Sequence, residues 1–322
     1  MTQTATAMMV QVRGERPSPI EITTRIPAEG EILVRMRAAA LNFADLLMVK
    51  GTYQETPPLP FVPGLEGAGE VVAVGPNTPF SAGDRVAVWA QGTMAEFGTF
   101  PAGRCIRIPD SMSYADAAGF QIAYGTSHLA LTARADLRAG EVLVVLGAAG
   151  GVGLTAVEIG AALGARVIAV ARGADKLAAA KAAGASDLID SDTTPDLKAA
   201  LRALGGADVV YDPVGDAPGL AAFGALRTGG RYLVIGFAGG KPPELPLNHA
   251  LVKNIAIHGF YWGGYGKLAP ELLRDSMTQL FAMVAEGRLT PRQGPLTPLS
   301  DLAQAYELLE SRRSIGKVVV SI

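Results

Sequence analysis

The feature that most constrains this chain is a regular alternation of short apolar runs and helical patterns between residues 142 and 260. Apolar runs indicate strands at Val142–Gly147, Ala165–Ala171, Asp187–Ile189, Ala207–Tyr211, Tyr232–Phe237 and Ile255–Phe260. Helical patterns lie between them at Gly151–Leu163, Ala174–Ala183 and Pro195–Leu204. Strands that alternate with helices of this length predict a parallel sheet that is covered by helices on both faces.

The segments before and after this alternation have different patterns. Candidate strands separated by Pro and Gly turn signals predict a compact, mostly antiparallel β domain, and they lie at Ile32–Met36, Gly69–Val74, Arg85–Trp89 and Cys105–Ile108. An Ala-rich helical stretch follows Ser113, a candidate N-cap. After Phe260, two helical patterns and a final strand are expected at Pro270–Ala285, Leu299–Arg312 and Lys317–Ile322.

The length of 322 residues points to more than one domain. We expect an α/β protein with a β domain over residues 1–121 and a doubly wound parallel-sheet domain over residues 122–260. Residues 261–322 are expected to return to the first domain, although periodicity alone does not predict that return.

Composition and charge exclude several classes of protein. About half of the residues are hydrophobic and under a fifth are charged, which is typical of a globular chain with a sizeable core. The net charge is −2 without a long basic run, so neither nucleic acid nor an anionic membrane is expected as a partner. The single cysteine, Cys105, excludes an intrachain disulfide and fits a cytoplasmic setting. Residues 1–12 lack a signal-peptide pattern, and glycines interrupt the apolar stretch Val142–Val157, which is too short to span a membrane.

The turn Gly147–Gly153 lies between an apolar strand and a helix, which is the context of a dinucleotide-binding turn. Glycines let the backbone turn sharply and approach a pyrophosphate, and the first amides of the following helix then face its negative charge. The match to the G-x-G-x-x-G pattern is imperfect, because Ala148 occupies the first glycine position. The alternative is a glycine-rich turn that binds no ligand.

The end of the second strand of the alternation should decide between the two nicotinamide cofactors. An NADH site usually has an acid there that accepts the ribose hydroxyls. This strand instead ends in Arg172, and Lys176 follows four residues later, so both cations can reach a 2′-phosphate. Asp175 is the nearest carboxylate in the sequence. These residues predict NADPH as the cofactor, and the alternative is that Arg172 and Lys176 are only solvated surface charges.

Short segments along the whole chain form a recognisable set: Leu41–Leu47, Gly51–Tyr53, Pro60–Gly69, Ala82–Val86, Ala123–Thr126, Ala148–Gly153, Asp212–Gly215, Ile235–Phe237 and Gly316–Val319. With them the sequence resembles the zinc-free quinone oxidoreductase branch of the medium-chain dehydrogenase/reductase superfamily, the branch that includes zeta-crystallin. The resemblance implies a GroES-like β domain, a Rossmann domain and a C-terminal return, with substrate bound in the cleft between the domains. It also implies a homodimer that pairs the last Rossmann strands, here around Ile255–Phe260.

The same resemblance implies roles for individual residues. Asn42 and Tyr53 would lie near the nicotinamide as the catalytic candidates. The cofactor would be held by Asn42, Thr126, Ala149, Gly150, Gly151, Val152, Arg172, Lys176, Gly236, Phe237 and Lys317. Among these, Ala149 to Val152 would meet the pyrophosphate, and Arg172 and Lys176 would hold the 2′-phosphate. Relatives often have a tyrosine where this chain has Ser191, so NADPH affinity is expected to be weaker or to depend more on Arg172.

The residues that hold catalytic zinc elsewhere in the superfamily are replaced. Zinc-binding members carry Gly-His-Glu where this chain has Gly64-Leu65-Glu66, and a cysteine where it has Asn42. The structural zinc lobe needs four cysteines, and only Cys105 exists. No metal is therefore expected, and Glu66 and Asp45 are interpreted as structural hydrogen-bond acceptors. Without a Lewis acid, reduction of an electron-poor double bond is easier than oxidation of an alcohol.

These observations predict an enzyme that reduces quinones or similar conjugated carbonyls by hydride transfer from NADPH without a metal. Its main task would be to place two flat rings face to face. Tyr53 is the candidate that hydrogen-bonds the developing oxyanion or donates a proton, or else it only packs at the cleft wall. Asn42 bonds the nicotinamide or the ribose, or else it caps a turn. Two alternatives are a reductase of α,β-unsaturated ketones, aldehydes or acids, and a non-catalytic NADPH-binding protein.

Overall fold

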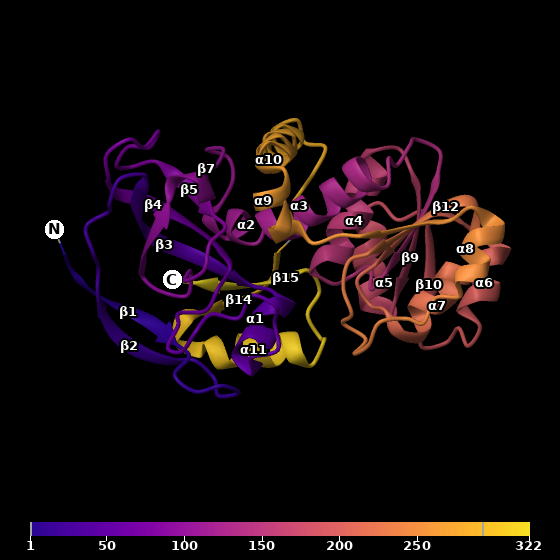
Figure 1. The fold of residues 1–322 in the computed structure, drawn as a ribbon, viewed down its shortest axis with the longest axis horizontal. Helices are drawn as coiled ribbons and strands as arrows, with labels where there is room; N and C mark the ends of the chain where they lie inside the picture. The colour runs from indigo at the N-terminus through magenta and orange to yellow at the C-terminus, as the bar shows by residue number, and fades with distance from the viewer. Residues whose placement is uncertain (1, 292) are drawn as a thin grey trace. The chain divides into compact units, whose positions relative to one another are not determined.

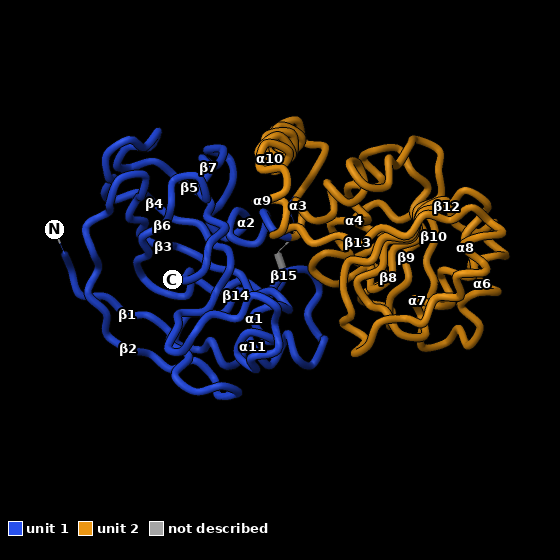
Figure 2. The backbone as a smooth tube through the Cα atoms, viewed as in Figure 1, with its two compact units in different colours: residues 1–122, 291–322 blue, residues 123–290 orange. Residues whose placement is uncertain are grey.

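The computed structural model describes residues 2–291 and 293–322, and the chain divides into two compact units (Figure 1 and Figure 2). Unit 1 comprises residues 1–122 and 291–322, and unit 2 comprises residues 123–290. The sequence placed the start of the C-terminal return at residue 261, whereas residues 261–290 group with unit 2. Two contacts account for this difference. Trp262 lies directly against Gly125, and the hydroxyl of Ser276 lies 2.9 Å from Nδ1 of the buried His128.

Unit 2 is built on a six-stranded sheet in which all neighbouring strands are parallel. Its strands lie in the order β10 (Asp187–Asp190), β9 (Arg166–Ala171), β8 (Val142–Leu146), β11 (Ala207–Asp212), β12 (Leu226–Val234) and β13 (Ala256–Gly259). The predicted parallel sheet is therefore confirmed. The strand order reverses between β8 and β11, and ligands of such sheets bind at this point, beyond the carboxyl ends of the strands.

Helices connect these strands and bury the sheet. They are α4 (Gly151–Ala162), α5 (Ala174–Ala182), α6 (Leu197–Ala203), α7 (Asp216–Gly224) and α8 (Leu247–Lys253). All five side chains of β8 are buried, as expected for a central strand covered on both faces. The other helical segments are α3 (Gln121–Leu129), a π-helical turn (Ala130–Arg134), a 3₁₀ turn (Trp262–Gly264), α9 (Tyr265–Leu268) and α10 (Pro270–Ala285).

Unit 1 contains a second sheet, which confirms the predicted β domain. Its strands follow the order β14 (Gln293–Pro298), β15 (Lys317–Ser321), β3 (Glu31–Leu41), β4 (Glu66–Val74), β5 (Arg85–Val88) and β7 (Cys105–Arg107), and β6 (Phe97–Pro101) also pairs with β3. Except for the parallel pair β14–β15, these pairs are antiparallel. The pairing of β15 with β3 sets Val318 opposite Leu41, so the end of the chain lies beside residue 42.

The remaining elements of unit 1 pack around this sheet or lie beside it. β1 (Thr4–Met9) and β2 (Ser18–Thr23) form a separate antiparallel pair. The helices are α1 (Phe43–Lys50), α2 (Tyr114–Ala118) and α11 (Leu302–Glu310), with 3₁₀ turns at Ala102–Arg104 and Leu299–Asp301. Ser113 caps α2 as predicted, since its hydroxyl accepts the N–H of Asp116 at 3.0 Å. Among the helices that the structure describes, none combines the length and the apolar character needed to cross a membrane.

Candidate functional site

The glycine turn between β8 and α4 is tightly closed. Gly147 has a φ of 58°, in the left-handed region. A Cβ on Gly153 would lie only 2.1 Å from the carbonyl oxygen of Gly147. Position 153 therefore accepts only glycine, because the backbone of the turn occupies the space that a side chain needs.

The start of α4 fits the anionic part of a dinucleotide. α4 spans 12 residues, and its N-cap, Gly150, provides no side-chain hydrogen bond to the first amides. The first N–H groups of a helix have no partner within the helix, and they favour a negative charge in front of them. The predicted residues Ala149, Gly150, Gly151 and Val152 thus lie where main-chain amides can bind a pyrophosphate.

A buried group of hydroxyls holds α4 against α3. The hydroxyl of Ser127 donates to the carbonyl of Val152 at 3.0 Å. It also lies 2.8 Å from Oγ1 of Thr155 and 3.0 Å from the hydroxyl of Tyr211. Thr126, the preceding residue, was predicted to contact the cofactor, and it is buried in α3. The sequence did not indicate Ser127, because a hydroxyl that bonds to a distant helix carbonyl leaves no local pattern.

The other predicted cofactor residues of unit 2 lie at the same edge of the sheet as the glycine turn. Arg172 follows β9, and Gly236 and Phe237 follow β12. Because the strands are parallel, their carboxyl ends share one edge. Phe237 is 41% exposed, so a flat ligand group can contact it.

Asp212, at the end of β11, shapes the loops of this edge. Its carboxylate accepts the N–H groups of Val214 and Gly215, both at 2.8 Å, and the hydroxyl of Tyr232 donates to it as well. Its carbonyl oxygen accepts the N–H of Ile235 at 2.9 Å, which fixes the path toward residue 236. Burial raises the pKa of Asp212, and these donors partly offset that effect.

Arg172 and Lys176 lie beside an acid that the sequence did not indicate. Nε of Arg172 lies 3.4 Å from Oδ1 of Asp192, in the loop after β10. Burial and the charge of Arg172 lower the pKa of Lys176, and the charge of Asp192 opposes this. Asp175 is closer in sequence, but the parallel pairing of β9 with β10 brings Asp192 to Arg172 instead.

In unit 1, the buried Glu66 and Lys317 and the half-buried Asn42 form a polar cluster. The ammonium of Lys317 lies 2.7 Å from Oε1 of Glu66, and it donates to Oδ1 of Asn42 at 2.5 Å and to the carbonyl of Leu41 at 2.9 Å. Nδ2 of Asn42 donates to Glu66 at 3.0 Å. The other carboxylate oxygen of Glu66 accepts the N–H of Ile122 at 2.9 Å. The pairing of β15 with β3 creates this cluster from residues that are far apart in the chain.

Asp45 lies next to this cluster, on α1. It is fully buried, and its carboxylate accepts the N–H groups of Asn42 at 2.8 Å and Gly64 at 3.0 Å. Burial raises the pKa of Asp45 to about 6, against the lowering effect of these hydrogen bonds and of Lys317. The interpretation of Asp45 and Glu66 as hydrogen-bond acceptors agrees with these contacts.

Tyr53 lies in the loop after α1. Its side chain is half-buried and packs against the apolar cluster that includes Leu46, Phe61 and Tyr306. Its carbonyl oxygen accepts the hydroxyl of Thr56 at 2.6 Å. The packing fixes the position of the ring, whichever of its two expected roles it has.

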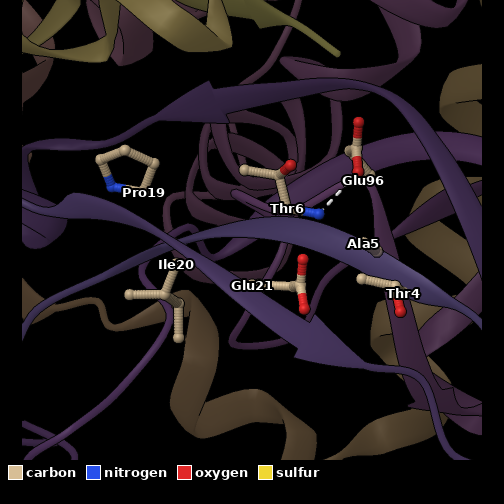
Figure 3. A pocket seen from close by; sticks show the side chains of 7 residues that line it. All are labelled: Thr4, Ala5, Thr6, Pro19, Ile20, Glu21 and Glu96. Carbon is tan, nitrogen blue, oxygen red and sulfur yellow. Dashed lines mark hydrogen bonds between the residues drawn. The ribbon is translucent and has the colours of Figure 1, made fainter.

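Two further features of the described chain bear on this site. Within residues 2–291 and 293–322, no group of three or more His, Cys, Asp or Glu is arranged to hold a metal ion. A hollow beside β1 and β2 is drawn in Figure 3, and none of the predicted site residues is among the residues that line it: Thr4, Ala5, Thr6, Pro19, Ile20, Glu21 and Glu96.

Two family models match the chain, one in each unit. The model of an alcohol dehydrogenase GroES-like domain matches residues 28–110, in unit 1. The model of a zinc-binding dehydrogenase matches residues 151–283, in unit 2. These matches confirm the predicted combination of a GroES-like domain and a Rossmann-type parallel sheet.

Individual relatives match over most of their length. The quinone oxidoreductase-like protein 2 homolog of Nematostella vectensis is 37% identical over 302 residues, which cover 90% of this chain and 81% of that protein. A mycobacterial protein solved in complex with NADPH is 30% identical, with a TM-score of 0.91 and coverage of 99% and 100%. The quinone oxidoreductase of Thermus thermophilus, also solved with NADPH, is 31% identical, with a TM-score of 0.87 and coverage of 98% and 100%. These similarities confirm the resemblance drawn from the sequence, and the chain belongs to the quinone oxidoreductase-like branch of the medium-chain dehydrogenase/reductase superfamily.

Proposed function

We propose that this protein reduces quinones, or similar conjugated carbonyls, with NADPH and without a metal ion. The observation that carries the proposal is the glycine turn, which opens a helix without a side-chain cap at the point where the strand order reverses. Relatives solved with NADPH support the cofactor, and relatives described as quinone oxidoreductases support the substrate class.

Unit 2 supplies most of the cofactor site in this proposal. The amides of Ala149 to Val152 bind the pyrophosphate, and Arg172 and Lys176 bind the 2′-phosphate. The rest of the cofactor meets Thr126, Gly236 and Phe237. When bound, NADPH supplies a hydride from C4 of its nicotinamide ring.

Unit 1 supplies Asn42, whose amide is already oriented. Lys317 donates to its Oδ1 and its Nδ2 donates to Glu66, so the amide cannot flip without breaking both hydrogen bonds. The amide is thereby held in the orientation in which we propose that it meets the nicotinamide or the ribose. The sequence led us to expect Lys317 to line the cofactor cleft. Its ammonium is instead surrounded by three protein oxygens, so we propose that it acts on the cofactor only through Asn42.

The proposed chemistry needs little help from acids or metals. Asn42 and Leu65 replace the zinc ligands of other family members, and an electron-poor acceptor takes a hydride without a Lewis acid. Tyr53 is the proposed hydrogen-bond donor to the substrate oxygen, and its packing against the core holds the ring in place.

The test is the loss of NADPH absorbance with a panel of ortho- and para-quinones and a matched panel of enones, at one NADPH concentration. We expect a higher kcat/KM for quinones, and a rate that does not change after dialysis against a metal chelator. A preference for enones would replace the quinone with the alternative substrate class. Tight NADPH binding without oxidation by any acceptor would leave a non-catalytic protein.

Tyr53→Phe tests the proposed donor separately. Loss of the hydroxyl is expected to lower kcat by about tenfold or more with little change in KM. An unchanged kcat would assign Tyr53 to packing and would leave the proposed reaction intact.

We also propose a homodimer that forms at β13. This strand pairs with β12 on one side and ends the six-stranded sheet, so no strand that the structure describes pairs with its other side. Ile257 on β13 is exposed, as are three apolar residues of α8: Leu247, Leu251 and Val252. Exposed apolar side chains beside an open strand edge favour pairing with a second copy.

A further inference from the structure

The charged residues at the ends of β9 and β10 do not form a purely basic site. Arg172 and Lys176 bring two positive charges, and Asp192 brings a negative charge 3.4 Å from Nε of Arg172. The side chain of Arg172 is 65% exposed and that of Asp192 is 57% exposed, so both can contact a ligand. The contact between them joins Nε of the Arg172 guanidinium to Oδ1 of Asp192.

The backbone holds Asp192 in this position. The carboxylate of Asp190 accepts the N–H of Asp192 at 3.0 Å and the N–H of Gly173, the residue after Arg172, at 3.1 Å. The N–H of Ser191 donates to the carbonyl of Ala171 at 2.9 Å. Two connections therefore join the loop that carries Arg172 to the loop that carries Asp192, so residues 172 and 192 are held close to each other.

We propose that Asp192 is a specificity-determining residue that competes with the 2′-phosphate of NADPH for Arg172. The inference rests on the proposed binding of that phosphate by Arg172 and Lys176. A phosphate carries a charge of about −1.5 to −2 at neutral pH, so the carboxylate of Asp192 beside Arg172 repels it. NADH has only hydroxyls at this place, and the carboxylate of Asp192 can accept hydrogen bonds from hydroxyls without repelling them. Asp192 therefore narrows the preference for NADPH over NADH.

The size of the effect follows from the exposure of the pair. Exposed charge pairs contribute little in water and are screened by salt. We therefore expect the carboxylate to weaken NADPH binding by about two- to tenfold at low ionic strength, and by less at high salt.

The experiment measures the Kd of NADPH and of NADH by calorimetry, which does not require turnover. Asp192→Asn keeps the shape and removes the charge. It is expected to tighten NADPH by about two- to tenfold, to leave NADH unchanged or weaker, and to lose much of the gain at high salt. Asp175→Asn is the matched control, because it removes an equal charge from the exposed first turn of α5. It is expected to change the ratio of the two constants less.

The outcomes separate this inference from the proposed function. If Arg172→Ala weakens NADPH but Asp192→Asn does not tighten it, the competition is absent while the phosphate site stands. If Asp192→Asn weakens NADPH, the carboxylate positions Arg172 and the inference is reversed. If Arg172→Ala leaves NADPH binding unchanged, both the phosphate site and the inference fail. In the background of Arg172→Ala, the gain from Asp192→Asn is expected to shrink.

Discussion

At the scale of single residues, the ion pair between Lys317 and Glu66 is buried in unit 1. The side chain of Lys317 is 8% exposed and that of Glu66 is fully buried. A charge in such a place is costly when its partner is removed, because water cannot replace the partner. Loss of either partner alone is therefore expected to be destabilising, and the pair also orients Asn42.

Lys317→Met is expected to lower the free energy of unfolding by about 3–5 kcal/mol, because it leaves the carboxylate of Glu66 buried without its counter-charge. Urea unfolding measures the change. Lys50→Met is the matched control, since Lys50 is 58% exposed and lies 3.8 Å from Glu310, and it should shift stability by no more than about 0.5 kcal/mol. The double variant Lys317→Met/Glu66→Gln should recover part of the loss. If Lys317→Met and Lys50→Met lowered the free energy of unfolding equally, burial of the Lys317–Glu66 pair would not matter for stability.

The raised pKa of Asp45 predicts that the stability of the protein depends on pH. Its pKa is raised from 3.8 to about 6 in the folded protein, so the folded state holds the proton more tightly than the unfolded chain does. The stabilisation is complete below the unfolded pKa and is lost as pH rises from about 4 to 6, which amounts to about 3 kcal/mol at ~1.4 kcal/mol per pKa unit.

Asp45→Asn removes this titration, so the comparison isolates it from other groups. The difference in the free energy of unfolding between the unmodified protein and the variant should fall as pH rises from about 4 to 6, and should be level above that window. Urea unfolding across this pH range provides the measurement. A difference that stays constant from about pH 4 to 7 would show that Asp45 does not titrate there.

At the scale of elements, the glycine turn and α4 carry the cofactor proposal. Gly153→Ala would place Cβ 2.1 Å from a backbone oxygen, so the turn must shift. We expect a loss of about 1–3 kcal/mol of stability and at least about tenfold weaker NADPH binding. At Gly150 a Cβ would meet only the carbonyl of Gly147, at 3.3 Å, and φ is −74°.

Gly150→Ala is therefore the informative comparison. It should leave stability within about 1 kcal/mol and still weaken NADPH binding, because its methyl group covers the amides at the start of α4. Calorimetry and thermal unfolding measure the two effects. If Gly150→Ala bound NADPH as well as the unmodified protein does, the pyrophosphate would not lie at this helix.

The elements that could be predicted are those with a strong local pattern. α10 has the predicted bounds, Pro270–Ala285, because proline suits the first turn and an apolar face repeats along it. β12 begins at Leu226, six residues before the predicted start, since its polar and glycine positions have no strand propensity and only pairing with β11 and β13 makes them a strand. Helices α1, α3, α7, α8 and α9 and strands β1, β2, β6 and β14 were not predicted.

The candidate site divides in the same way. The glycine turn and Arg172 could be predicted, since they follow buried strands that all end at one edge. The contacts of Asp192 with Arg172 and of Lys317 with Glu66 depend on which strands become neighbours. Pairing of distant strands decides these contacts, so no local pattern indicates them.

At the scale of the whole molecule, each unit has its own apolar core, and the predicted assembly uses the open edge of unit 2. Leu247, Leu251 and Val252 of α8 are 69%, 77% and 72% exposed. α8 leads directly into β13, so these side chains and the unpaired strand edge belong to neighbouring segments. Burying both in one interface removes apolar area from water and pairs backbone groups at the same time.

We therefore expect light scattering to give a mass of about twice the 33.3 kDa of one chain. Leu251→Glu places a charge in the proposed interface and should shift the protein toward the mass of a single chain at low concentration. Leu268→Glu is the matched control, because Leu268 is 71% exposed but lies on α9. A dimer that survives Leu251→Glu but dissociates with Leu268→Glu would move the interface from β13 to the segment around α9, since each substitution adds the same charge to an equally exposed leucine.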